Sequence, residues 1–227
     1  MKSRSLIIKL MFLAVLGNVF CRAQSSSTPG ASSATSPAAD EKWRSQFKAT
    51  GQVGQPASTP ARNTGDVTYT FHKPQDTTPE LEAYFATIEK NLTRAADFYN
   101  RYTSLKKHLN IYYSPGTPTA DGNFNGSIRL GKNASNARIL MHEFCHTMGV
   151  GQHPSWSKLM VDHRWQGKHA NKLLQEWTHD PNAQLHGDRM HFWPYGLNYD
   201  NEVKSDEDLV RHAQMVEAIV KDLDEVK

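Results

Sequence analysis

Two histidines stand four residues apart inside an apolar stretch, and this spacing constrains the fold more than any other feature of the chain. The segment is His142-Glu143-Phe144-Cys145-His146, preceded by Arg138-Ile139-Leu140-Met141 and followed by Gly149. Side chains at positions i and i+4 share one face of an α-helix, and glycine is the residue that most often ends a helix. The pattern therefore predicts a largely buried helix over 137–148 that carries both imidazoles on one face.

The residue types on this helix are those of a metal site with a general base. Two imidazoles at this spacing can bind one Zn²⁺ ion at roughly 2.0–2.1 Å. Glu143 lies about 100° round the helix from His142, where its carboxylate can take a proton from a water molecule at the metal without binding the metal itself. This is the HExxH pattern of metallopeptidases. We therefore expect His142 and His146 to be zinc ligands and Glu143 to be the general base.

A catalytic zinc ion takes three protein ligands, and the sequence offers two candidates for the third. His191 is followed by Phe192-Trp193-Pro194, a stiff and bulky segment of the kind that holds a ligand firmly. His153 comes soon after the helix, but the extended pattern HExxHxxGxxH would need histidine where Gln152 stands. Gly151 offers a way to absorb the extra residue, because glycine permits positive φ. We favour His191 and keep His153 as the alternative.

Other residues near the motif receive weaker assignments. Tyr195 either donates a hydrogen bond to an oxyanion during the reaction or packs within its Pro-Tyr-Gly turn, and the sequence supports both equally. Cys145 is expected to fill the core and to point away from the histidine face. Four further histidines are expected at the surface or in loops: His163, His169, His179 and His186.

The N-terminal part predicts export followed by a linker. Residues 1–23 have a basic start, a short apolar core and small residues before a cleavage position after Ala23, which is typical of a secretory signal peptide. Lipid attachment at Cys21 is the alternative, which the bulky Phe20 disfavours. Residues 24–65 are rich in Ser, Thr, Pro and Ala and predict a disordered linker. We therefore expect a secreted protein, extracellular or periplasmic, that meets a membrane only transiently through its signal peptide.

The charge balance excludes one class of partner. The formal net charge of +3 includes four basic residues of the predicted signal peptide. Without them, 22 of the 26 basic residues remain, against 23 acidic residues. A nucleic-acid surface needs a basic face, so we expect no nucleic-acid partner.

Of the two cysteines only Cys145 remains after cleavage, which excludes an internal disulfide in the mature chain. We expect a monomer.

Residues 66–227 are expected to form one α+β domain. The periodicity of apolar residues and the turn signals predict strands over 67–71, 109–113 and 127–130, and helices from Thr77-Thr78-Pro79 to Tyr99, over 137–148, 170–177 and 206–223. This order predicts a small mixed sheet with the motif helix and long N- and C-terminal helices. The strand over 127–130 is expected to be the edge strand that takes an extended substrate.

Three segments together resemble a known family. They are His142-Glu143-Phe144-Cys145-His146-Thr147-Met148-Gly149-Val150-Gly151, Pro118-Thr119-Ala120-Asp121-Gly122-Asn123 and His191-Phe192-Trp193-Pro194-Tyr195-Gly196-Leu197-Asn198-Tyr199. Over roughly residues 66–224 the chain resembles secreted zincin-like proteins of bacteria and fungi, some of which carry ricin-type lectin domains. The resemblance implies a zincin or metzincin-like catalytic fold and histidine as the third ligand at His191. It implies little about the substrate.

These observations lead to one hypothesis with two alternatives. The leading hypothesis is a secreted zinc-dependent endopeptidase that acts on a protein or peptide. The first alternative is a zinc-bearing binding module of a cell surface or matrix without catalysis, which the presence of Glu143 argues against. The second is a zinc hydrolase of a non-peptide amide, which the sequence separates poorly from the leading hypothesis.

Overall fold

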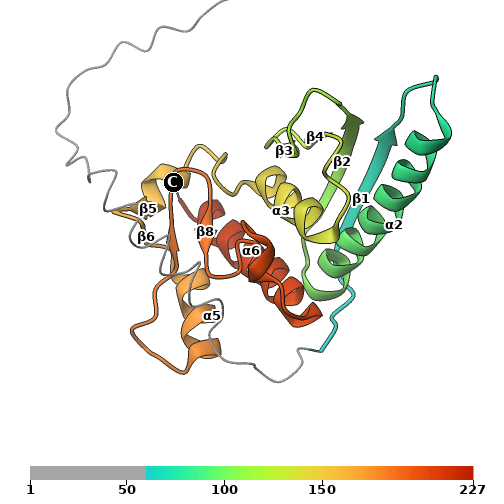
Figure 1. Cartoon of the computed structure of the whole chain (residues 1–227). Coiled ribbons are helices and arrows are strands. Elements are labelled where there is room, and N and C mark those ends of the chain that lie inside the picture. The colour runs from blue at the N-terminus through green and yellow to red at the C-terminus, as the bar shows by residue number, and fades with distance from the viewer. Residues whose placement is uncertain (1–59, 227) are drawn as a thin grey trace, which may run out of the picture. The chain divides into compact units, whose positions relative to one another are not determined.

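The computed structural model describes residues 60–226 (Figure 1). The predicted signal peptide over 1–23 and the predicted linker up to residue 59 lie outside the described residues. The remaining part of that linker is bonded to the end of α2 (Pro79–Tyr102), because the backbone N–H groups of Arg62 and Gly65 donate to the carbonyls of Arg101 and Asn100 at 2.6 and 3.1 Å. The folded domain therefore begins a few residues before Asp66.

A mixed sheet forms one layer of the domain. Its strands are β1 (Asp66–His72), β2 (Lys106–Tyr113), β3 (Ala120–Gly122) and β4 (Ser127–Leu130), in the order β1-β2-β4-β3. The pairs β1–β2 and β2–β4 are parallel, and β3 is antiparallel to β4. The α+β class and the small mixed sheet are thus confirmed, but the prediction that 127–130 is the edge strand is wrong. β3 occupies that edge, because the chain turns after Asn123 and β4 returns antiparallel to β3.

The alternation of side chains turns one face of this sheet toward two helices. Val67, Leu109 and Ile128 are buried on that face, where α2 and α3 (Ala137–Met148) pack against the strands (Figure 1). The opposite face carries polar side chains such as Thr68, whose hydroxyl bonds His108 at 3.0 Å. The core that supports the motif helix therefore lies between the sheet and the helical layer.

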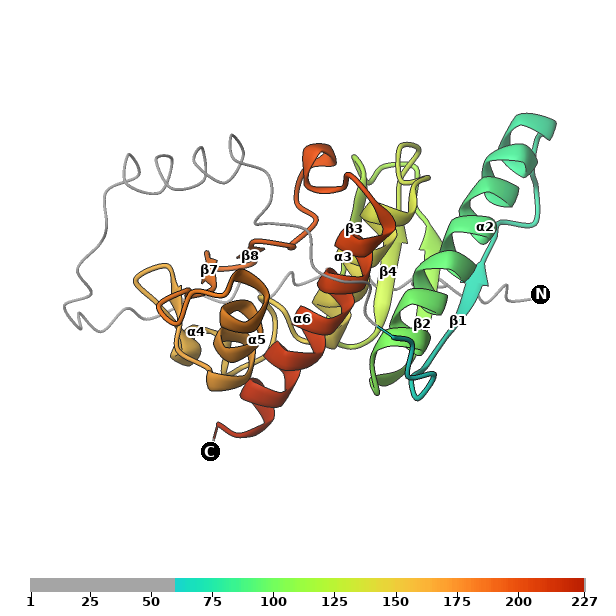
Figure 2. The same cartoon turned by 90° about the horizontal axis from the view of Figure 1, so that it is seen from below.

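The long helices begin where their capping residues predict. The Thr78 side chain accepts a hydrogen bond from the N–H of Leu81 at 3.3 Å, and Pro79 occupies the first turn of α2. At the start of α6 (Asp206–Asp224), the N–H of Ser205 donates to the Asp208 carboxylate at 3.0 Å. α6 lies between α3 and α5 (Lys168–Thr178), as Figure 2 shows. Within residues 60–226, no helix combines the length and the apolar character needed to cross a membrane.

The region expected to be irregular contains a second sheet. After α4 (Trp156–Leu159), the strands β5 (Met160–Val161), β6 (Arg164–Trp165), β7 (His186–Gly187) and β8 (Phe192–Trp193) pair antiparallel in that order, before a short 3₁₀ helix, η1 (Asp200–Glu202). Strands of two residues are too short to show alternation, so the sequence gives no signal for them. Asp222 of α6 fixes the start of α5 by accepting hydrogen bonds from the N–H groups of His169 and Ala170 at 2.7 and 3.0 Å.

Candidate metal centre

The helix α3 carries the two motif histidines and has the predicted bounds. Its first turn is capped by Asn136, whose side chain accepts a hydrogen bond from the N–H of Ile139 at 2.9 Å. It ends at Gly149, which has φ of 120° and donates its N–H to the carbonyl of His146 at 3.1 Å. Most of its side chains are buried. The ring positions of His142 and His146 are therefore fixed by a helix that is held at both ends and packed on several sides.

The two helix histidines point their Nε2 atoms at each other across 3.2 Å. Each Nδ1 atom lies 2.9 Å from a backbone carbonyl oxygen, of Gly196 for His142 and of Val150 for His146. A carbonyl only accepts hydrogen bonds, so each ring carries its proton on Nδ1, and a neutral imidazole then has an unprotonated Nε2. Both Nε2 atoms therefore direct lone pairs into the same small space.

The protonation of these rings follows from their surroundings. Burial, and next the neighbouring imidazole of His146, lowers the pKa of His142 well below its ordinary value. Burial also lowers the pKa of His146. A hydrogen bond between the two Nε2 atoms would need one ring to be an imidazolium, which these lowered pKa values disfavour. The neutral imidazole is also the form that binds a metal ion.

His191 lies beside this pair. Its ring centroid is 5.4 Å from that of His142 and 5.5 Å from that of His146, and the helix rings are 4.8 Å apart. Its Nδ1 faces the carboxylate of Asp188 at 3.3 Å. A carboxylate partner on Nδ1 fixes the tautomer that leaves Nε2 to bind a metal, as carboxylate–histidine pairs do in metal sites. The structure thus brings together three imidazoles, two from α3 and one from the segment before β8.

Asp188 holds the His191 segment in place as well as its ring. One carboxylate oxygen accepts hydrogen bonds from the N–H groups of Met190 and His191, each at 2.7 Å. Burial alone would raise the pKa of Asp188, but the hydrogen bonds from His191 and from these backbone groups hold it well below its ordinary value. Asp188 is therefore ionised. Asp188 was not predicted from the sequence, although an acid three positions before a candidate ligand is a signal for such a partner.

The loop after α3 packs directly on the segment that carries His191. Gly151 has φ of 69°, and a Cβ atom added there would lie 2.5 Å from the Cα of Met190. The indole of Trp156 donates to the carbonyl of Asp188 at 3.1 Å. Gly151 therefore permits the close approach of the His191 segment, and it does not absorb an extra residue on behalf of His153.

His153 is engaged elsewhere. Its ring contacts Phe124 at a centroid distance of 5.3 Å, and its Nδ1 accepts a hydrogen bond from the N–H of Ser155 at 3.0 Å. The preceding Gln152 donates to the carbonyl of Gly122 at 2.6 Å and accepts from the N–H of Phe124 at 3.2 Å. Among residues 60–226, the ring contacts recorded for the helix pair involve His191 and not His153.

Glu143 lies on α3 next to the edge strand β3. Its side chain is 6% exposed, and a Cβ atom added to Gly122 would clash with its backbone carbonyl. Burial raises the pKa of Glu143 to about 7, against an opposing hydrogen bond from the backbone of Gly122. A carboxylate with this pKa is suited to exchange a proton near neutral pH. Glu143 is thus held against Gly122 of the edge strand.

The structure changes the expectation for Cys145. The Cys145 sulfur and one ring nitrogen of each helix histidine all lie within 4.8 Å of one another, so Cys145 does not point away as expected. Position i+3 lies only about 60° round the helix from His142. Burial raises the pKa of the Cys145 thiol well above its ordinary value. A metal binds the thiolate, so the thiol form that burial favours is not the form that binds a metal.

Tyr195 is 3% exposed, and its hydroxyl accepts a hydrogen bond from Arg211. This contact favours the packing role of Tyr195 over the role of an oxyanion donor.

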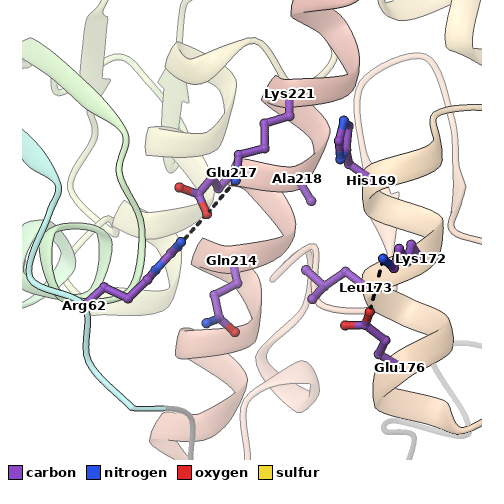
Figure 3. Close-up of a pocket in the computed structure, with 9 residues that line it drawn as sticks. All are labelled: Arg62, His169, Lys172, Leu173, Glu176, Gln214, Glu217, Ala218 and Lys221. Carbon is purple, nitrogen blue, oxygen red and sulfur yellow. Dashed lines mark hydrogen bonds and ion pairs between the residues drawn. The ribbon is translucent and has the colours of Figure 1, made fainter.

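A cavity of about 360 Å³ lies apart from these residues, between α5 and α6 (Figure 3). Its charged lining residues are paired with one another. Glu217 binds Arg62 at 2.5 Å and Lys221 at 3.4 Å, and Lys172 lies 4.0 Å from Glu176. None of the candidate metal ligands lines this cavity. The histidine cluster, and not this cavity, is therefore the chemically distinctive site.

Comparison with known proteins assigns no family. No family model, no curated protein and no solved structure matches this chain. The resemblance to zincin-like proteins thus stays a prediction.

Proposed function

We propose that this protein is a zinc-dependent endopeptidase, with His142, His146 and His191 as metal ligands and Glu143 as general base. The observation that carries the proposal is the pair of unprotonated Nε2 atoms that face each other across 3.2 Å. Two lone pairs at this distance repel each other unless a cation lies between them. Two nitrogen ligands of one tetrahedral zinc ion lie about 3.3 Å apart, which agrees with the separation of these atoms.

The donor set limits the choice of metal. Imidazole binds zinc, copper, iron and nickel, whereas magnesium and calcium prefer oxygen. Three protein ligands with room for a fourth, non-protein ligand are typical of catalytic zinc. Zinc is therefore the proposed ion, with the other imidazole-binding metals as outcomes of metal analysis.

The residues of the chain have separate parts in this proposal. A bound zinc ion supplies Lewis acidity, which lowers the pKa of water to about 7 and polarises a carbonyl. Glu143 takes the proton of the attacking water and passes it to the leaving amine, because its pKa of about 7 suits both transfers. Gly196, Val150 and Asp188 hold the Nδ1 protons, so that each ring keeps Nε2 available.

The edge strand supports a peptide as substrate. The N–H of Asn123 donates to Ser127 and that of Gly131 donates to Thr119, so odd-numbered residues of β3 bond β4 and even-numbered ones face outward. Gln152 binds the outward carbonyl of Gly122. By the same alternation, Ala120 directs its N–H and carbonyl to the open edge. An extended peptide that pairs with Ala120 would run beside Glu143. A small non-peptide amide would have no use for this edge.

Export remains part of the proposal because of residues 1–23. Their basic start, short apolar core and small residues before a cleavage position after Ala23 are typical of a cleaved signal peptide. We propose that the enzyme works outside the cytoplasm on proteins or peptides.

Digestion of an unbiased peptide library tests the proposed activity. The purified protein should cleave peptides, lose the activity with a zinc chelator and regain it with added Zn²⁺. Glu143→Gln keeps the shape of the side chain but removes the proton acceptor, so it should retain zinc and lose about 10²–10⁴-fold in rate. Cleavage by this variant at the wild-type rate would exclude Glu143 as the base. Zinc binding without any cleavage would favour the binding module or the non-peptide hydrolase.

A further inference from the structure

His212 of α6 is fully buried and has polar partners on both of its ring nitrogens. Its Nδ1 lies 2.7 Å from the carbonyl oxygen of Tyr195. Its Nε2 lies 3.0 Å from the hydroxyl of Tyr99 and 3.1 Å from the carbonyl oxygen of Met141. The imidazole therefore joins three segments that are far apart in the sequence: α2, α3 and the turn after β8.

His212 contacts the residue directly before His142 and the residue directly before Gly196, the hydrogen-bond partner of His142. Met141 directly precedes His142 on α3, and Tyr195 directly precedes Gly196, whose carbonyl accepts the Nδ1 proton of His142. The position of the Gly196 carbonyl relative to α3 thus depends on what holds the Tyr195–Gly196 turn against that helix. His212 is a single side chain that contacts both parts.

The turn needs such an anchor because Tyr195 has φ of 66°, a conformation that residues other than glycine rarely adopt. α6 binds this residue at both ends. Arg211 donates to its hydroxyl and lies over its ring at 5.0 Å, and His212 holds its carbonyl. Arg211 contacts the side chain of Tyr195, whereas His212 is bonded to the backbone from which Gly196 continues.

The two ring nitrogens of His212 each lie near a backbone carbonyl oxygen, but at different distances. The carbonyls of Tyr195 and Met141 can both only accept, and a neutral ring carries one proton, so the shorter distance, 2.7 Å at Nδ1 against 3.1 Å at Nε2, assigns that proton to Nδ1. Burial lowers the pKa of His212 to about 4, so the ring is neutral and Nε2 is unprotonated. The Tyr99 hydroxyl lies 3.0 Å from Nε2 and 3.2 Å from the Met141 carbonyl, and with Nε2 unprotonated it donates to this side of the ring. The two nitrogens of His212 therefore have different roles, and substitutions can separate them.

We propose that His212 is a positioning residue for the metal centre: its Nδ1–H holds the Tyr195–Gly196 turn so that the Gly196 carbonyl orients the His142 ring. This inference rests on the proposed function only in naming the metal as the consequence. The orientation of His142 is a property of the chain itself. An ordinary buried core histidine would contribute to stability without this effect on one particular ligand.

Two conservative variants test the role of each nitrogen. His212→Asn places an amide N–H near the position of Nδ1 and retains the bond to Tyr195, whereas His212→Gln places its amide nearer to Nε2 and loses that bond. Both remove the aromatic ring, so each is the control for the other in stability. Tyr99→Phe removes the partner of Nε2 and leaves the Tyr195 bond intact.

Three measurements on the purified protein distinguish positioning from stability. Chelator competition should show that His212→Gln weakens zinc binding by about 10–100-fold, as loss of an outer partner of a ligand does, whereas His212→Asn and Tyr99→Phe stay close to wild type. The visible absorption of the Co²⁺-loaded protein should change in His212→Gln alone. Denaturant unfolding should show similar losses of stability in the two His212 variants. Equal zinc affinity in His212→Gln and wild type would overturn the proposal. Equal losses of zinc affinity in both His212 variants would overturn it as well.

A nuclear magnetic resonance measurement without metal separates this inference from the proposed function. The Nδ1–H resonance of His142 should be protected from exchange in the wild type and in His212→Asn, and should exchange rapidly in His212→Gln. A protein that binds no zinc but shows this pattern would refute the metal site and retain the positioning role. Should His212→Gln not fold, zinc titration of the wild type decides: the Nδ1–H resonance of His212 must shift on binding, and an unchanged resonance contradicts the coupling.

Discussion

The Nε2 atoms of His142 and His146 face each other across 3.2 Å, and both rings carry their protons on the opposite nitrogen. Two neutral rings in this arrangement have no hydrogen bond to make with each other. The helix spacing brings them together, but the carbonyls of Gly196 and Val150 determine what the pair can do. Those carbonyls leave both Nε2 lone pairs available for the cation that we propose.

The third ligand is tested by a pair of alanine variants. His191→Ala should weaken zinc binding by more than about 100-fold, because removal of a ligand costs more than removal of its outer partner. His153→Ala should bind zinc nearly as well as wild type, since its ring contacts Phe124 and Ser155. Chelator competition measures both affinities. The reverse order of effects would make His153 the ligand.

The close approach at Gly151 predicts a specific loss of stability. Gly151→Ala should lower the free energy of unfolding by about 2 kcal/mol or more, because the residue has φ of 69° and the new Cβ meets the backbone of Met190. It should also weaken zinc binding by displacing His191. Gly116→Ala is the matched control, since a Cβ there meets nothing within 4 Å, and it should stay within about 0.5 kcal/mol of wild type. Equal stability of both variants would contradict this packing.

Gln152 is predicted to fasten the edge strand and not to bind metal. Gln152→Ala removes two hydrogen bonds, to Gly122 and Phe124, and should lower the free energy of unfolding by about 1–2 kcal/mol. Zinc affinity should persist. Gln166→Ala serves as control because this exposed side chain bonds only the nearby carbonyl of Arg164, and its effect should stay below about 0.5 kcal/mol. Loss of zinc in Gln152→Ala would show that this loop does more than hold β3.

The buried His212 predicts a dependence of stability on pH. Its pKa is about 4 in the folded protein and about 6.5 in the unfolded chain. Below pH 6.5 the unfolded chain therefore binds the proton first, so stability falls as the pH drops from 6.5 to 4 and levels off below that. Between pH 7 and pH 5 this residue should lower the free energy of unfolding by about 2 kcal/mol.

Denaturant unfolding of wild type and His212→Asn at several pH values isolates this contribution. Other titrating groups are common to both proteins, so the difference between the two curves reports His212. The wild type should lose more stability on acidification than the variant. Parallel curves would show that His212 is not buried in its neutral form.

Much of the helical framework was predictable because its signals are local. Thr78 and Pro79 start α2, and the apolar spacing with Gly149 gives α3 its predicted bounds. The strands of the second sheet are two residues long, and no periodicity can reveal them. The place of β3 at the sheet edge depends on pairing between distant residues. The sequence therefore predicted which helices form better than it predicted which strands pair with each other.

In the candidate site, too, the local features were predictable and the contacts between distant residues were not. The HExxH spacing predicted which rings share a face, and the stiff segment after His191 favoured the residue that the structure brings beside them. The partners that fix the tautomers could not be predicted, since the Gly196 and Val150 carbonyls belong to the backbone and carry no residue signature. Cys145 was misplaced through a simple error of helix geometry, because position i+3 remains on the side of His142.

X-ray absorption spectroscopy of the zinc-loaded protein tests the central claim most directly. The expected result is one zinc ion per chain with three imidazole nitrogens at about 2.0–2.1 Å and one further light-atom ligand. The imidazole scattering should fall from three rings to two in His191→Ala. A sulfur ligand at about 2.3 Å would assign Cys145 to the metal, and failure to bind zinc at all would contradict the site formed by His142, His146 and His191.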